Sequence, residues 1–164
     1  MLYETIFKRR AVRKYNMMPL DVETLSLIRK LLDETEQISE QNARFEIVSA
    51  DKVKSATAPH YIMSYCKSGD AEYVNIGYVL EKADLYIQSL GLGSLWLGMA
   101  KPKEDDSDFC IMLAFGKSDI PFRMKEQEFN RLPVSELSAV DNTIARAAPF
   151  GAVGVQLAAM EITL

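Results

Sequence analysis

The sequence has 164 residues, of which 48% are hydrophobic and 26% charged, and its formal net charge is −4. This length and composition indicate a globular chain with its own core and exclude a disordered one. The acidic balance argues against a general nucleic-acid binder, whose surface is basic. No apolar stretch reaches the roughly 18 residues of a membrane span, and the start lacks the apolar centre of a signal peptide, so we expect a cytoplasmic protein.

The first part of the chain is predicted to contain two helices separated by a basic cluster. Residues 2–8 form a short helix that leads into the sequence RRAVRK, residues 9–14. Asp21 is placed to cap a second helix, which ends near Glu36. Its apolar stripe at helical spacing consists of Leu25, Ile28, Leu31 and Leu32.

Two strands and a long helix are expected next. The sequences RFEIVSA, residues 44–50, and HYIMSYC, residues 60–66, are typical of strands. Asp70 opens the helix, whose apolar residues recur every three or four positions, so that one face is buried. Gly91 and Gly93 are expected to end it.

The rest of the chain begins with two apolar segments. Residues 95–99 are short and apolar, and residues 109–115 (FCIMLAF) form a continuous apolar run, as expected for a strand buried on both faces. Residues 121–133 are irregular and charged, and we expect 135–148 to be helical. The order of helices and strands predicts a mixed α+β fold in layers, with a single domain over 1–164.

The basic cluster is the first candidate binding site. Arg9, Arg10 and Arg13 lie within five residues of an otherwise acidic chain. Guanidinium groups bind phosphate through forked, charge-assisted hydrogen bonds, so three of them can surround one phosphate. The alternative is a solvated basic turn at the surface.

The glycine-rich sequence GLGSLWLG, residues 91–98, does not have the pattern of a nucleotide-binding loop. A dinucleotide fingerprint needs a third glycine at the position of Trp96 and follows a strand, whereas this sequence follows a helix. A phosphate-binding loop would continue with lysine and serine or threonine. We interpret the segment as a helix cap followed by a buried strand, where glycine lets the backbone approach a flat ligand.

Other residue types offer little chemistry. Cys66 and Cys110 lie far apart in the sequence, and we interpret them as isolated, reduced core residues. His60 is the single histidine, which argues against a zinc site and a Ser/His/Asp triad and favours a structural role. The acidic run at 104–108 is interpreted as a solvated loop rather than a cation site.

Four motifs, taken in order, resemble the nitroreductase family. They are RRAVRKY at 9–15, YVLEKADLYIQSLGLGSLWLGM at 78–99, IMLAFGK at 111–117 and RLPVSEL at 131–137. The resemblance implies a nitroreductase-like α/β/α sandwich with a mainly antiparallel central sheet, shortened at the C-terminus. It also implies a homodimer with FMN in a cleft between the subunits.

The resemblance also implies roles for particular residues. Arg9, Arg10, Arg13 and Arg131 would bind the FMN phosphate, and the backbone near Gly98 and Met99 would face the flavin ring. FMN would carry the chemistry, taking electrons from NAD(P)H and passing them to a small nitro, quinone or related acceptor. No side chain is required as a nucleophile or an essential base.

The sequence departs from the family pattern at two places. Ala11 stands where the family has a serine, and the family's Pro-Ser-x-x-Asn-x-Gln-Pro-Trp segment is absent from the sequence. Two alternatives to an FMN-dependent oxidoreductase therefore stay open. One is a binding or scaffold protein without flavin, and the other is a flavin-handling protein that binds FMN as substrate or cargo.

Overall fold

The computed structural model describes residues 2–38, 43–67, 69–124 and 128, and the strands 138–141 and 144–147. The chain separates into two compact units, Met1–Glu126 and Gln127–Leu164, which are described separately. The elements of the first unit are α1 (Leu2–Lys8), α2 (Val22–Glu34), β1 (Arg44–Ser49), the 3-10 helix η1 (Ala50–Lys52), β2 (His60–Tyr65), α3 (Asp70–Ser89), β3 (Gly93–Leu97) and β4 (Phe109–Gly116).

The centre of the first unit is an antiparallel sheet with the strand order β1-β2-β4-β3. Ile62 of β2 lies opposite Ile47 on one side and Leu113 on the other. All six residues of β2 are buried. The apolar run of β4 is buried over its last five residues, as expected for an inner strand. The predicted α+β class with an antiparallel sheet is confirmed.

Helix α2 begins where its cap predicts. The Asp21 carboxylate accepts a hydrogen bond from the backbone N–H of Thr24 at 2.7 Å, which satisfies one of the unpaired donors of the first turn. Ile28 and Leu32 are its buried residues. The helix ends at Glu34, two residues before the predicted end.

A glycine just beyond the end of α3 turns the chain out of the helix. Gly91 has a φ of +79°, which is the left-handed region that a side chain disfavours. Its N–H donates to the carbonyl of Gln88 at 3.0 Å, and the N–H of Leu92 donates to that of Ile87 at 3.2 Å. These two bonds are the Schellman pattern, and buried Leu92 and Ile87 supply its hydrophobic partners.

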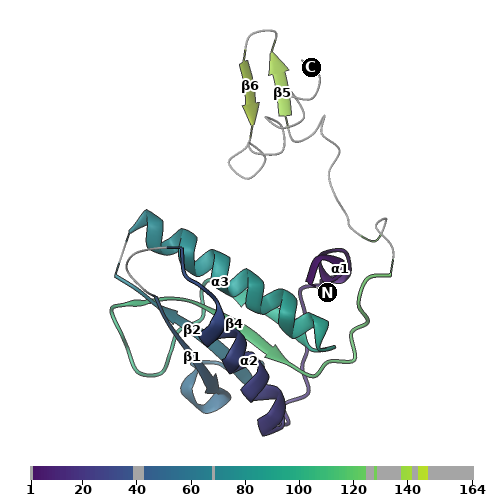
Figure 1. The fold of residues 1–164 in the computed structure, drawn as a ribbon, viewed down its shortest axis with the longest axis vertical. Helices are drawn as coiled ribbons and strands as arrows, with labels where there is room; N and C mark the ends of the chain where they lie inside the picture. Colours follow the sequence, from purple (N-terminus) through teal and green to yellow (C-terminus); the bar gives the residue numbers. More distant parts are fainter. Residues whose placement is uncertain are drawn as a thin grey trace. The chain divides into compact units, whose positions relative to one another are not determined.

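The two faces of the sheet have different coverings. Helices α2 and α3 both pack on the face that carries Ile62 and Leu113, and Figure 1 shows both lying along the sheet. The opposite face, which carries Tyr61 and Met63, packs against the segment 50–58 and against Leu97 and Ala100. The helices α2 and α3 therefore lie on one face of the sheet, and the segment that contains η1 lies on the other.

The second unit contains strands where a helix was predicted. Strands β5 (Ser138–Asp141) and β6 (Ile144–Ala147) pair antiparallel, with Asp141 opposite Ile144. The prediction of a helix over 135–148 is wrong for these residues. Val140 and Ile144 are β-branched, which favours strands. That the whole chain forms one domain stays a prediction.

Candidate functional site

Three of the predicted phosphate-binding arginines, Arg9, Arg10 and Arg13, lie on an extended segment, residues 9–16, which we call the strap. The N–H of Val12 donates to the carbonyl of Ser94 at 2.9 Å, so the strap continues the sheet beyond β3. Further along, the N–H of Asn16 donates to the carbonyl of Lys117 at 2.9 Å. Val12 is buried between exposed Ala11 and Arg13, as the alternation of an extended chain requires.

The backbone of Arg10 is held by the side chain of Gln88. Its N–H donates to Oε1 of Gln88 at 2.9 Å, and Nε2 of Gln88 donates back to its carbonyl at 3.2 Å. Both peptide groups of Arg10 are therefore paired with one side chain of α3. Its guanidinium donates to the carbonyl of Pro121 at 3.3 Å.

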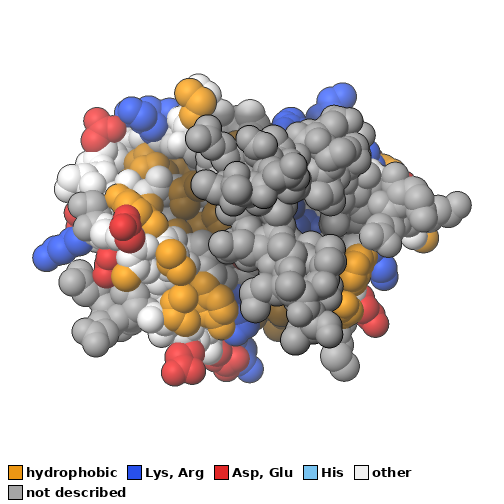
Figure 2. Space-filling model, turned by 90° about the horizontal axis from the view of Figure 1, so that it is seen from above, with side chains coloured by type: hydrophobic (Ala, Val, Ile, Leu, Met, Phe, Trp, Pro, Cys, Tyr) orange, Lys and Arg blue, Asp and Glu red, His pale blue; other side chains and the backbone are white. Residues whose placement is uncertain are grey.

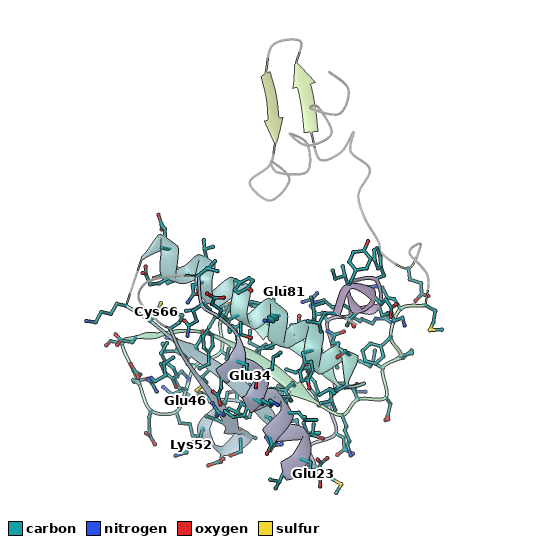
Figure 3. All side chains as sticks on the ribbon, viewed as in Figure 1. Glu23, Glu34, Glu46, Lys52, Cys66 and Glu81 are labelled. Carbon is teal, nitrogen blue, oxygen red and sulfur yellow. The ribbon has the colours of Figure 1, made fainter. Side chains whose placement is uncertain are left out.

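Arg9 forms an ion pair with a buried carboxylate. Its Nε and Nη2 each lie 2.6 Å from Oδ2 of Asp84, whose side chain is fully buried. Glu81, halfway along α3 (Figure 3), lies 3.7 Å from Nε of Arg9. Burial raises the pKa of Glu81, while Arg9 lowers it and Asp84 raises it.

Asp84 is also the centre of a wider polar network. Its Oδ2 accepts from Nε1 of Trp96 at 3.1 Å, and its Oδ1 accepts from Nε2 of Gln88 at 3.2 Å and from the Ser94 hydroxyl. With the hydrogen bond from Nε of Arg9, the carboxylate accepts hydrogen bonds from α3, β3 and the strap, and Nη2 of Arg9 adds an ion-pair contact. A buried charge is stable only when it is paired and hydrogen-bonded in this way.

Arg13 differs from Arg9 and Arg10, because its side chain has no partner among the described residues. It is exposed, and no described residue forms a hydrogen bond or ion pair with it. In Arg9, Nε and Nη2 contact Asp84, and no contact of Nη1 with a described residue is seen. Arg131, the fourth predicted phosphate ligand, lies outside the described residues.

Gly98 and Met99 lie at the far end of β3 from the strap contact. Both are exposed, Met99 to 96%, and a Cβ added at Gly98 would meet nothing within 4 Å. They line a hollow of about 330 Å³ together with Phe109 and Cys110. Because Ser94 and Gly98 are four residues apart in an extended strand, roughly 13 Å separates the two ends of the candidate site.

His60 has the structural role predicted for it. Its Nε2 accepts a hydrogen bond from the backbone N–H of Leu20 at 2.9 Å. Its ring stacks on Phe115 with 5.6 Å between ring centres. Burial lowers the pKa of His60, so the neutral form that accepts this bond is favoured.

The acidic run is paired with basic side chains of β1 and the segment after it. The pairs are Glu104 with Lys52 at 3.5 Å, Asp105 with Lys54 at 2.9 Å, and Asp106 with Arg44 at 3.1 Å. Within the described ranges, no group of three or more His, Cys, Asp or Glu residues could hold a metal ion. The interpretation as a surface loop agrees with these contacts.

Sequence reasoning missed two features of this region. Asp84 lies among the apolar positions of α3, beside Ala83 and four residues after Leu80. A charged residue on an apolar stripe is a signal for a buried pair, and it was readable in the sequence. Cys66 and Cys110 are free and pack against the core as half-buried residues, but their sulfur atoms are 3.2 Å apart, so the prediction that they are isolated from each other is wrong.

In the part of the chain that the structure describes, no helix has both the length and the apolar character needed to cross a membrane.

Several solved structures share the fold. A "putative nitroreductase" of Thermotoga maritima has a TM-score of 0.59 at 18% identity, covering 85% of this chain and 57% of its own. A "putative nitroreductase in complex with FMN" from Desulfovibrio desulfuricans has a TM-score of 0.60 at 18% identity, covering 85% and 96%. A nitroreductase family protein of Clostridium difficile 630 has a TM-score of 0.60 at 19% identity, covering 86% and 97%.

These matches establish a nitroreductase-type fold, and this chain spans little more than half of the Thermotoga maritima protein. No curated protein gives a significant match to the sequence. The family model described as "Putative TM nitroreductase" matches residues 1–152. The chain therefore belongs to this nitroreductase family.

Proposed function

We propose that the protein is an FMN-dependent oxidoreductase that transfers electrons from NAD(P)H to a small nitro, quinone or related acceptor, and that it works as a homodimer. The observation that carries this proposal is the exposed Arg13 on a strap whose backbone is hydrogen-bonded to Ser94 and Lys117. Membership of the nitroreductase family and the FMN complex of the Desulfovibrio desulfuricans relative support it.

The residues present fit a ligand that has a phosphate at one end. Arg13 offers a whole guanidinium fork, and Arg9, on the same strap, has Nη1 outside its contacts with Asp84. Arg10 and Arg131 remain part of the proposed phosphate site. The open surface at Gly98 lies further along β3, where a flat ring can approach the backbone.

The protein's own residues would bind and orient the cofactor. When bound, FMN supplies the chemistry of hydride acceptance and electron transfer. Arg13 would hold the phosphate, and the arginines together would make the site electropositive, which stabilises negative charge on a reduced ligand. The backbone at Gly98 and Met99 would support one face of the ring and leave the other face for substrate.

The experiment that tests the phosphate site is a comparison of two ligands. Arg13→Ala should weaken FMN binding roughly 10- to 100-fold, because one set of charge-assisted hydrogen bonds is lost. Riboflavin binding should change little, since riboflavin has no phosphate. Lys30→Ala is the matched control, because Lys30 is an exposed cation of α2 that pairs with Glu34 at 3.7 Å. Equal losses for both flavins would refute the role of Arg13.

Arg9→Ala is a poor test of the same point. Removing Arg9 leaves the fully buried Asp84 carboxylate without its charge partner. Loss of FMN binding would then follow from damage to the fold as readily as from a missing phosphate ligand.

A flavin-free binding protein is the second candidate. It is favoured by the engagement of Arg9 with Asp84 and by the methyl group of Ala11 at the position of the family's serine. A visible spectrum before and after incubation with FMN and gel filtration separates the candidates. A retained flavin band that bleaches with anaerobic NADH or NADPH supports the oxidoreductase. A band that does not bleach supports flavin handling, and a colourless protein supports the flavin-free form.

A further inference from the structure

Two cysteines that are distant in the sequence meet at one end of the sheet. Cys66 directly follows β2, where α3 is about to begin (Figure 3), and Cys110 is the second residue of β4. Their sulfur atoms are 3.2 Å apart, and both thiols are free and half-buried. The N–H of Cys66 donates to the carbonyl of Asp108 at 2.8 Å, which fixes the backbone beside the pair.

A β-bulge produces this meeting. Ser64 pairs with Ile111, but Tyr65 pairs with Phe109, so Cys110 is an extra residue in β4. In a regular ladder Cys110 would pair with Tyr65 and point to the face opposite that of Cys66, because side chains alternate. With the bulge, Cys66 and Cys110 both pack against the helix-side core.

Small reagents can reach the pair at Cys110. Cys110 lines the hollow of about 330 Å³ beside Gly98 and Met99. It also lines a second hollow of about 410 Å³, whose wall includes Tyr73 and Trp96. A thiol at an open hollow with a second thiol in contact has the arrangement of a reactive dithiol rather than of two core residues.

We propose that Cys66 and Cys110 are a reversible redox pair that small-molecule disulfides oxidise to an intramolecular disulfide. The Cys110 thiolate attacks one sulfur of the small disulfide, forming a mixed disulfide and releasing one thiol. The Cys66 thiolate then attacks Sγ of Cys110, forming the Cys66–Cys110 bond and releasing the second thiol. Two electrons and two protons pass from the protein thiols to the small disulfide, which becomes two thiols.

The surroundings determine the order of the two steps. Burial, followed by the hydrogen bond with Cys110, raises the pKa of the Cys66 thiol. Cys66 is therefore rarely a thiolate at neutral pH, and the first attack falls to Cys110 at the hollow. Because the two sulfur atoms are in contact, the second step is intramolecular. Its rate therefore stays high although only a small fraction of Cys66 is a thiolate. The rate of oxidation should rise with pH.

The test treats the reduced, purified protein with glutathione disulfide and follows the intact mass. The wild-type chain should lose two hydrogens, retain no glutathione and recover its mass on reduction with dithiothreitol. Peptide mapping should place the bond between Cys66 and Cys110. Retained glutathione, disulfide-linked dimers or an unchanged mass would each overturn the proposal. The result does not depend on whether the protein binds FMN.

Serine variants test the two roles. Cys66→Ser should stop at the mixed disulfide and hold one glutathione per chain, at concentrations roughly 100-fold above those that oxidise the wild-type chain, because the intramolecular step is gone. Cys110→Ser should react more slowly than Cys66→Ser. Circular dichroism of both variants checks that they fold, and the wild-type measurement stands if either does not. Faster reaction of Cys110→Ser would overturn the assigned order.

Discussion

At the scale of single residues, Asp84 connects three parts of the first unit. Its carboxylate joins the strap through Arg9, the edge strand through Ser94 and Trp96, and the next turn of its own helix through Gln88. Four hydrogen-bond donors reach one buried carboxylate, and Nη2 of the Arg9 guanidinium adds an ion-pair contact. The charge is therefore compensated as long as Arg9 is present.

Removing this carboxylate should damage the fold. We expect Asp84→Ala to lower the free energy of unfolding by about 3–5 kcal/mol, because the partly buried Arg9 loses its partner and three neutral donors lose their acceptor. Asp84→Asn keeps the shape and one acceptor oxygen, so its cost should be smaller. Urea titrations measure both. Asp33→Ala, at an exposed site on α2, is the control and should stay within about 0.5 kcal/mol of the wild type. An equal loss of unfolding free energy in Asp84→Ala and Asp84→Asn would contradict the argument that the remaining acceptor oxygen stabilises the fold.

The arginine cluster shows how far sequence reasoning reached at this scale. It assigned Arg9, Arg10 and Arg13 to one phosphate site, and that assignment stays a prediction. It did not distinguish their surroundings, because Arg9 finds its partner 75 positions away, at Asp84. A contact between residues so far apart in the sequence depends on how α3 lies on the sheet, and local sequence patterns do not specify this.

At the scale of elements, the packing of the strap against β3 depends on one glycine. A Cβ added at Gly93 would lie 2.8 Å from Cγ1 and 2.9 Å from Cγ2 of Val12. Val12 is 1% exposed, so it has little room to move. The absence of a side chain at Gly93 therefore lets the strap lie close to the sheet.

This contact predicts a non-additive pair of substitutions. Gly93→Ala should cost about 1–3 kcal/mol by overpacking and should displace the strap. Val12→Ala alone should also destabilise, since it removes buried methyl groups. In the double variant both Cγ contacts are relieved and only the contact with Cβ of residue 12, at 2.9 Å, remains, so the cost should fall below the sum of the single costs. A thermal or urea double-mutant cycle measures this, and strict additivity would contradict the contact.

The helices and strands of the first unit follow from local signals. Periodicity and caps predict the ends of α2, α3, β1, β2 and β4 to within two residues. Each of these elements has an apolar stripe or an apolar run that covers most of its length. The hairpin of β5 and β6 was predicted as a helix, since short segments with mixed spacing carry no decisive period. The bulge at Cys110 was not predictable, because register depends on the partner strand.

At the scale of the whole molecule, α1 presents an apolar stripe outward. Tyr3, Ile6 and Phe7 are 70%, 44% and 43% exposed, at the spacing that places residues on one helix face. Tyr3 and Phe7 touch edge to face at 5.4 Å between ring centres. Figure 2 shows other hydrophobic side chains exposed between charged ones on the described surface. A stripe of this kind is typical of a contact surface between subunits.

The proposed homodimer gives this stripe a measurable consequence. Sedimentation equilibrium should give twice the chain mass of 18.5 kDa. Tyr3→Ser combined with Phe7→Ser should shift the protein toward monomer, because apolar area at the interface is lost. Val22→Ser, at a residue of α2 that is 78% exposed, is the control and should leave the mass unchanged. A monomeric wild-type protein would refute the homodimer.

The position of the strap has a further consequence for solubility. Strand β3 is at one edge of the sheet, and its sequence GSLWL is apolar and free of charge. An edge of this kind offers unpaired peptide groups to the strands of neighbouring molecules and invites aggregation. The strap occupies that edge at Ser94, through Val12 and the bridge from Ala11. The segment that carries the arginines therefore also shields the start of an aggregation-prone strand, and a change that loosens it would expose that strand even in a molecule that keeps its core.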